Sequence, residues 1–120
     1  LVIGNMNKIL FICSANKQRS ATAEDYFSAK YPELTFESAG TNHKICLKEG
    51  TQALEERHLE WADIIIVMEK RHSDIIKKNA VNNYQNKIHV ANIKDIFKFY
   101  QKELLNELEN KIDPIISNFK

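Results

Sequence analysis

The 120-residue chain lacks most of the features that mark specialised classes of protein. It has only two cysteines, Cys13 and Cys46, and we expect both to stay reduced rather than to form a disulfide. Its longest apolar run, residues 64–68, is far too short to cross a bilayer, and its first residues lack the charged and then apolar layout of a signal peptide. We therefore expect a cytoplasmic protein without a membrane partner.

Charge of one sign is also scarce. The formal net charge is +1, and lysines are mixed with glutamates along the chain, so no surface for nucleic acid is predicted. The four histidines are scattered, and none has cysteine or carboxylate neighbours at the spacing of metal ligands. We expect neither a metal nor another cofactor.

Length and apolar content fit one compact domain over residues 6–120, as a monomer or a weak dimer. Residues 1–5 precede Met6, the expected natural start, and are interpreted as a cloning remnant or a disordered start. The chain has no internal repeat and no low-complexity tract.

Apolar runs and helix-forming segments alternate along the chain. Strands are predicted over residues 8–13, 35–38, 63–68 and 87–90, and helices over residues 21–30, 48–57, 70–79 and about 101–119, the last with a kink at Pro114. This alternation predicts a three-layer α/β/α fold around a parallel sheet, with a ligand beyond the carboxyl ends of the strands.

The most informative segment runs from Cys13 to Ser20, directly after the first predicted strand. This loop would lie at a helix N-terminus, where unpaired N–H groups and the helix dipole attract anions and favour the thiolate form of Cys13. The planar guanidinium of Arg19 suits two oxygens of a phosphoryl group, and Ser20 is close enough in sequence to donate a hydrogen bond to the sulfur. The segment predicts a nucleophile that handles phosphate.

At Cys13, Asn16, Arg19 and Ser20 the segment resembles the phosphate-binding loop of the low-molecular-weight protein tyrosine phosphatases, Cys-x-Gly-Asn-x-Cys-Arg-Ser. Residues 38–41 are similar to the Ser-Ala-Gly-Thr segment of that family, and residues 62–69 to its Ala-Asp-x-Ile-x-x-Met-Asp strand. The resemblance covers nearly the whole chain from Met6 onward.

This resemblance implies a four-stranded parallel sheet in the order 2-1-3-4, with the phosphate-binding loop after the first strand. Asn16, Ser20 and Ser38 are expected to support the loop through hydrogen bonds. The residues that it implies for the loop are Ser14, Ala15, Asn16, Lys17, Gln18, Arg19 and Ser20.

The resemblance also implies an aspartate that protonates the leaving group. The family carries it in an Asp-Pro-Tyr-Tyr type loop before the final helix. This chain has Asp95 at the equivalent place, without the proline and with Phe97 as its aromatic residue. We therefore assign Asp95 as the general acid, which then activates water. Asp113, followed by Pro114, keeps the literal dipeptide near the C-terminus and is the alternative.

Lys17 and Phe97 are placed on the substrate rim. Lys17 would favour acidic surroundings in the substrate, and Phe97 would either stack on an aromatic ring or pack in the core, whereas Phe99 is expected in the core. Arg71 and His72, which follow a turn, are also expected to line the rim.

Two departures from the family pattern bear on the site. Gln18 replaces the second loop cysteine of the family, so Cys46 is either a resolving thiol or, as we prefer, a plain free cysteine. Residues 41–61 form a shorter stretch than in typical members, which removes part of a pocket wall.

Three functions compete at this point. The first is a phosphatase that forms a phosphocysteine on Cys13, with a phosphorylated protein or a small phosphomonoester as its partner; protein phosphotyrosine is preferred over phosphoarginine and small molecules. The second is a non-catalytic phosphate-binding or regulatory module. The third is an arsenate reductase, which requires a relay of further cysteines.

Overall fold

Four parallel strands form the sheet of the computed structural model, which describes residues 6–119. The strand order is β2-β1-β3-β4, as predicted. The prediction for residues 1–5 lies outside the described residues. The strands are β1 (Lys8–Cys13), β2 (Thr35–Gly40), β3 (Ile64–Val67) and β4 (Ile88–Val90), the last preceded by a 3-10 turn at Gln85–Lys87.

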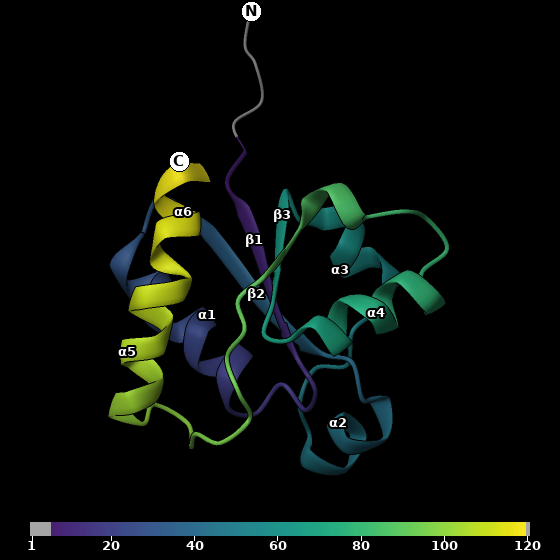
Figure 1. The fold of residues 1–120 in the computed structure, drawn as a ribbon. Helices are drawn as coiled ribbons and strands as arrows, with labels where there is room; N and C mark the ends of the chain where they lie inside the picture. Colours follow the sequence, from purple (N-terminus) through teal and green to yellow (C-terminus); the bar gives the residue numbers. More distant parts are fainter. Residues whose placement is uncertain (1–5, 120) are drawn as a thin grey trace, which may run out of the picture.

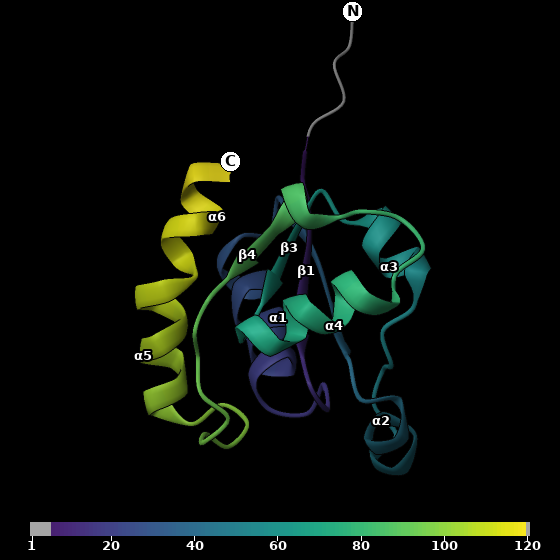
Figure 2. The ribbon, with the colours of Figure 1, turned by 45° about the vertical axis from the view of Figure 1, so that its right-hand side comes forward.

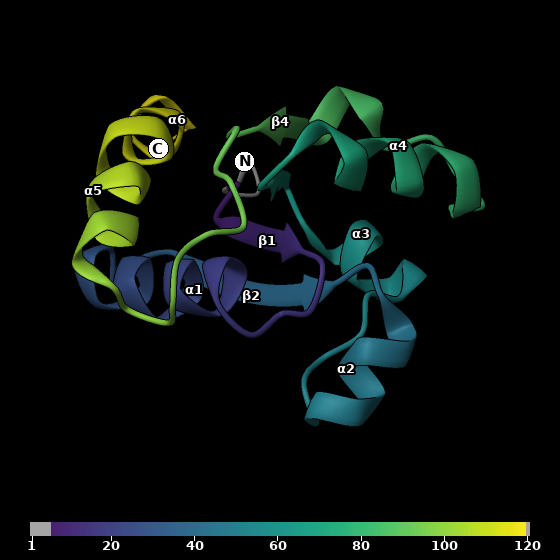
Figure 3. The same ribbon diagram turned by 60° about the horizontal axis from the view of Figure 1, so that its bottom comes forward.

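Helices cover both faces of the sheet, which confirms the three-layer α/β/α prediction (Figures 1 and 3). One face carries α1 (Arg19–Lys30), α5 (Lys102–Lys111) and α6 (Asp113–Phe119), and the other carries α3 (Glu56–Trp61) and α4 (Lys70–Asn79). The short helix α2 (His43–Glu49) lies beyond the carboxyl end of β2. Within residues 6–119 no helix is both long and apolar enough to span a membrane.

The central strand β1 is apolar because both of its faces are covered. Ile9, Phe11 and Cys13 pack with the helices of one face, whereas Leu10 and Ile12 pack in a second cluster on the other face. Cys13, the last residue of β1, is therefore held by a strand that is buried from Ile9 onward.

The helix predicted over residues 48–57 is wrong. Asn42 begins α2 by accepting the N–H of Ile45 at 3.1 Å, and Gly50 ends this helix with a left-handed φ of 70°. The chain then runs extended along β2, where Gly40 bridges to Ala53. A capping box at Glu55 starts α3. Gly50, a poor helix former and a frequent C-cap, was the local sign of this break.

Other boundaries differ from the predictions by a few residues. Helix α1 begins at Arg19 instead of residue 21, and β2 extends to Gly40 instead of residue 38. The kink predicted at Pro114 is confirmed, because α5 ends at Lys111 and α6 begins at Asp113.

Packing of α5 on the sheet can be tested at Leu104, which is fully buried in the cluster that contains β1. Leu104→Ala is expected to lower the free energy of unfolding by about 2–5 kcal/mol, because it leaves a cavity in a closed core. Leu47 of α2 is 86% exposed, so Leu47→Ala should change stability by less than about 0.5 kcal/mol. Urea titrations followed by circular dichroism measure both, and equal losses would contradict this packing.

Candidate active site

The loop of residues 14–18 joins β1 to α1 at the carboxyl end of the sheet (Figure 2). Gln18 occupies the N-cap position of α1 but makes no side-chain cap. Within the described part of the chain, the backbone N–H groups of residues 15–18 have no hydrogen-bond acceptor. These donors and the N-terminus of a 12-residue helix together form a place where an anion is stabilised.

The sulfur of Cys13 lies 2.9 Å from the hydroxyl oxygen of Ser20. The Ser20 oxygen accepts a hydrogen bond from the Asn16 amide, also at 2.9 Å. Its own proton is therefore free to point at the sulfur, where it stabilises a thiolate.

Asn16 holds the loop in a conformation that few residues adopt. Its φ is 54°, in the left-handed region that asparagine tolerates better than most side chains. Besides Ser20, its amide donates to the Ser38 hydroxyl at 2.8 Å, and its oxygen accepts from the N–H of Gln52 at 3.2 Å. Ser38 donates in turn to Glu24 at 2.5 Å. Burial raises the pKa of Glu24, and the Ser38 hydrogen bond opposes this rise.

Gly40 lets β2 approach the loop closely. A Cβ at this position would lie 2.5 Å from the carbonyl oxygen of Ser14 and 2.5 Å from the sulfur of Cys46. The Ser14 atom belongs to the backbone, so the clash could be relieved only by moving the loop. The glycine is thus required by space rather than by its backbone angles.

Arg19 is buried, with 1% of its surface exposed. Its guanidinium donates to Glu69 and, at 2.8 Å, to the carbonyl oxygen of Ile93. Partial burial raises the pKa of Glu69, but hydrogen bonds from Arg71 and Arg19 outweigh this effect and hold the pKa below its ordinary value. The ionised Glu69 therefore fixes the orientation of Arg19.

The two candidate acids lie in different surroundings. A carboxylate oxygen of Asp95 is 3.7 Å from the Arg19 guanidinium, and its side chain is 55% exposed. Asp113 instead accepts from the hydroxyl of Tyr31 at 2.6 Å and pairs with Lys30 at 2.9 Å. Both partners follow or end α1, at the opposite end of that helix from the loop. The structure brings Asp95, but not Asp113, to the loop.

We expected His72 on the rim of the loop. Its side chain is instead buried behind the loop. Its Nδ1 accepts the N–H of Glu69 at 3.0 Å, so in the neutral ring Nε2 carries the proton and donates to the Ser14 hydroxyl at 3.0 Å. Burial and the charges of Arg19 and Arg71 lower the pKa of His72 to about 4. The ring is therefore neutral at physiological pH.

The two residues predicted for the substrate rim differ in their exposure. Lys17 is exposed and pairs with Glu49 at 3.0 Å. Phe97 is half-buried and packs against the core. The core position expected for Phe99 is wrong, because its ring is 47% exposed and lies beside Tyr100.

Cys46 fills space under the loop. Its sulfur is fully buried and lies 3.5 Å from the carbonyl oxygen of Ala15 and 3.8 Å from that of Ser14. Both cysteines are free thiols. Among residues 6–119 no three histidine, cysteine or carboxylate side chains gather in a way that could hold a metal.

Sequence reasoning missed three residues of this site and misplaced His72 of α4, which contacts Ser14. Glu69, after β3, accepts from Arg19, and Gln52 contacts Asn16 from the extended chain beside β2. Glu24 of α1 accepts from Ser38, which in turn contacts Asn16. One local signal was available: Glu69 and His72 have the spacing of a capping box.

Comparison with solved structures identifies the fold. The tyrosine phosphatase Wzb from Escherichia coli K30 superimposes with a TM-score of 0.78 at 20% identity, over 96% of this chain and 99% of Wzb. A low-molecular-weight protein tyrosine phosphatase from T. tengcongensis gives 0.73 at 24% identity, over 93% and 99%. The YwlE arginine phosphatase from Geobacillus stearothermophilus gives 0.72 at 23% identity, over 93% and 92%.

The chain therefore has the fold of the low-molecular-weight protein tyrosine phosphatases. No protein-family model and no curated protein sequence matches it.

The buried ring of His72 predicts a loss of stability in acid. Between its folded-state pKa of about 4 and its ordinary value of 6.5, the unfolded chain binds a proton that the folded chain does not. The contribution of neutral His72 is complete above pH 6.5 and is lost as the pH falls to about 4. Its size is at most about 3 kcal/mol.

Urea titrations at several pH values between these limits test this prediction. His72→Gln should lose less stability on acidification than the wild type, whereas His89→Gln, at an exposed position, should lose as much as the wild type. Equal pH dependence in His72→Gln and the wild type would refute the prediction.

Proposed function

We propose that this protein is a phosphatase that hydrolyses phosphomonoesters through a phosphocysteine on Cys13. The observation that carries the proposal is the convergence of three groups on one loop. The Cys13 sulfur is 2.9 Å from the Ser20 hydroxyl, Arg19 is fixed at the end of the loop, and Asp95 lies 3.7 Å from Arg19. These supply a nucleophile, a phosphate ligand and, next to that ligand, a proton donor.

In the first step the Cys13 thiolate attacks phosphorus, and the bond from phosphorus to the leaving oxygen breaks. Asp95 gives its proton to that oxygen, so the product leaves as a neutral alcohol or phenol. The backbone N–H groups of residues 15–18 and the Arg19 guanidinium hold the three equatorial oxygens, on which negative charge is spread.

In the second step the Asp95 carboxylate takes a proton from water, whose oxygen attacks phosphorus. The phosphorus–sulfur bond breaks, inorganic phosphate forms, and the sulfur leaves as a thiolate that the Ser20 hydroxyl stabilises. Asp95 is again protonated and the loop is ready for a second substrate. No oxidant, reductant or metal enters this cycle.

We infer that protein phosphotyrosine is the first substrate to test. The support comes from the fold, which this chain shares with proteins described as tyrosine phosphatases. Phosphoarginine is the second substrate to test, since another protein of the same fold is described as an arginine phosphatase. Both present a dianion with three oxygens to the loop.

Hydrolysis of para-nitrophenyl phosphate and phenyl phosphate, without added metal, tests the chemistry. Cys13→Ser should be inactive because it removes the nucleophile. Asp95→Ala should lower turnover by roughly 10²- to 10⁴-fold, and more for phenyl phosphate, whose leaving oxygen is the more basic. Asp113→Asn is the control, because Asp113 contacts Tyr31 and Lys30 instead of the loop, and its kcat/KM should match the wild type.

Three outcomes would overturn parts of this proposal. A folded wild type that binds phosphate without turnover would identify a non-catalytic binding module. Slow turnover in Asp113→Asn with normal turnover in Asp95→Ala would exchange the two acids. Reduction of arsenate by the wild type, with thiol as the electron donor, would favour a reductase, although the chain has only Cys46 besides Cys13 to serve in a relay.

A further inference from the structure

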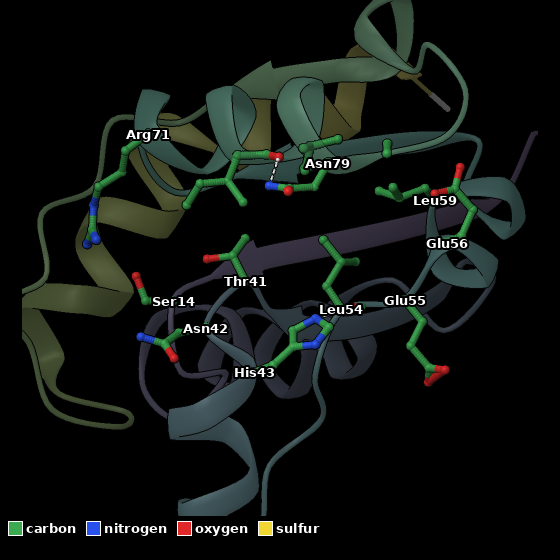
Figure 4. A pocket seen from close by; sticks show the side chains of 13 residues that line it. Ser14, Thr41, Asn42, His43, Leu54, Glu55, Glu56, Leu59, Arg71 and Asn79 are labelled. Carbon is green, nitrogen blue, oxygen red and sulfur yellow. Dashed lines mark hydrogen bonds between the residues drawn. The ribbon is translucent and has the colours of Figure 1, made fainter.

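A groove of about 780 Å³ begins beside the phosphate-binding loop and runs away from it (Figure 4). One wall is formed by residues 41–43 and 54–56, and the opposite wall by α4. Ser14 lies at one end, so the groove starts at the residue that follows the candidate nucleophile. We call it the α4 groove. Its volume is that of a ligand site.

The α4 groove is separate from the reacting groups. Cys13, Arg19 and Asp95 do not line it. Ser14 is the residue shared by the loop and the groove, and its hydroxyl is fixed by the hydrogen bond from His72. A phosphoryl group on the loop would therefore have the groove beside it, placed to contact the rest of the substrate.

The groove changes character along its length. At the loop end Arg71 lies near Ser14, and Arg71 is paired with Glu69 at 2.9 Å. In the middle Leu54 lies on one wall and Ile75 on the other, among the polar side chains of Thr41, His43 and Asn79. Ile75 is 38% exposed, a large apolar side chain open to solvent in a concave place.

The far end of the groove is acidic. Glu55 and Glu56 lie there, away from Ser14 and Arg71 (Figure 4). The hydroxyl of Tyr84 lowers the pKa of Glu56, so this carboxylate stays ionised, but its oxygens already accept from Tyr84 and from the N–H groups of Val81 and Asn82. Glu55 is exposed and forms an ion pair with Arg57 at 3.5 Å. This ion pair is weak because both side chains are exposed to solvent. The far end can therefore accept a cation.

We infer that the α4 groove binds the polypeptide next to the phosphorylated residue of a protein substrate. An apolar side chain lies between Leu54 and Ile75, and a lysine or arginine further along pairs with Glu55. This inference rests on the proposed function, because it takes the loop as the phosphate site. It adds a sequence preference: an apolar residue and then a basic residue on one side of the phosphorylated residue.

Charge complementarity favours a polypeptide over a small phosphomonoester. The ligand needs a dianion at the loop, an apolar group in the middle and a cation at the acidic end. A peptide carries these groups on successive side chains of one extended backbone. A small phosphomonoester that fits the loop has no group that extends to Glu55.

Binding of peptides with a non-hydrolysable phosphonate analogue of phosphotyrosine tests the inference without turnover. Each peptide carries one leucine and one lysine in an alanine background, and the lysine is moved along both flanks. Fluorescence anisotropy gives Kd. Lysine at one or two neighbouring positions of one flank should tighten binding by roughly three- to tenfold over alanine.

Two pairs of variants locate the effect. Glu55→Gln keeps the oxygen that caps α3 but removes the charge, so the lysine advantage within this variant should vanish; Glu60→Gln, on the same helix outside the groove, should keep it. Ile75→Ser should remove the advantage of leucine. Ile45→Ser, at a similarly exposed position on α2, should keep that advantage.

The inference would be overturned if the wild type showed no preference for lysine, or if this preference survived in Glu55→Gln. A dimer, detected by sedimentation, that Ile75→Ser dissociates while peptide binding is unchanged would also overturn it, because the groove would then be covered by a second copy. Hydrolysis of para-nitrophenyl phosphate by the wild type is measured in parallel. A lysine preference without hydrolysis would uphold the groove and refute the proposed chemistry.

Discussion

One buried guanidinium ties the site together. Arg19 has 1% of its surface exposed, a position in which its charge would be strongly unfavourable without the carboxylate of Glu69 and the carbonyl of Ile93. Glu69 follows β3 and Ile93 follows β4, so a single side chain joins the start of α1 to the turns after two strands. The loop before Arg19 is thereby fixed at both ends, by β1 and by this ion pair. A concave loop that is held in this way needs little rearrangement to receive an anion.

The middle of the loop is fixed by β2 and by the extended chain beside it. Asn16 keeps its left-handed backbone because Ser38 of β2 and the N–H of Gln52 satisfy its side chain. The absence of a side chain at Gly40 allows this approach. The same amide orients the Ser20 hydroxyl toward Cys13. The backbone strain at Asn16 and the hydrogen bond to the sulfur therefore depend on one another, which couples loop shape to the state of the nucleophile.

Local patterns in the sequence predicted the parts of this fold that depend on residues close to one another in the chain. The apolar run of β1 and the residues from Cys13 to Ser20 lie next to one another in the chain, so strand, loop and helix could be predicted together. Glu69 and His72 contact the loop from more than 45 residues away, and only the sheet order brings them there. The helix predicted over residues 48–57 failed because pairing of Gly40 with Ala53 draws that segment into an extended shape. In this second case a tertiary contact overrode helix propensity.

The connection between β2 and β3 has two tasks within one small domain. Part of it holds the loop of residues 14–18, because Cys46 and Gln52 contact that loop. Leu54, Glu55 and Glu56 form one wall of the α4 groove, opposite Arg71 and Ile75. Changes in the charge of residues 54–56 can therefore alter what lies beside the loop without disturbing the hydrogen bonds of Asn16 and Arg19. In the proposed function, recognition of the substrate and chemistry on phosphorus meet at Ser14, whose hydroxyl is held in place by the neutral ring of His72.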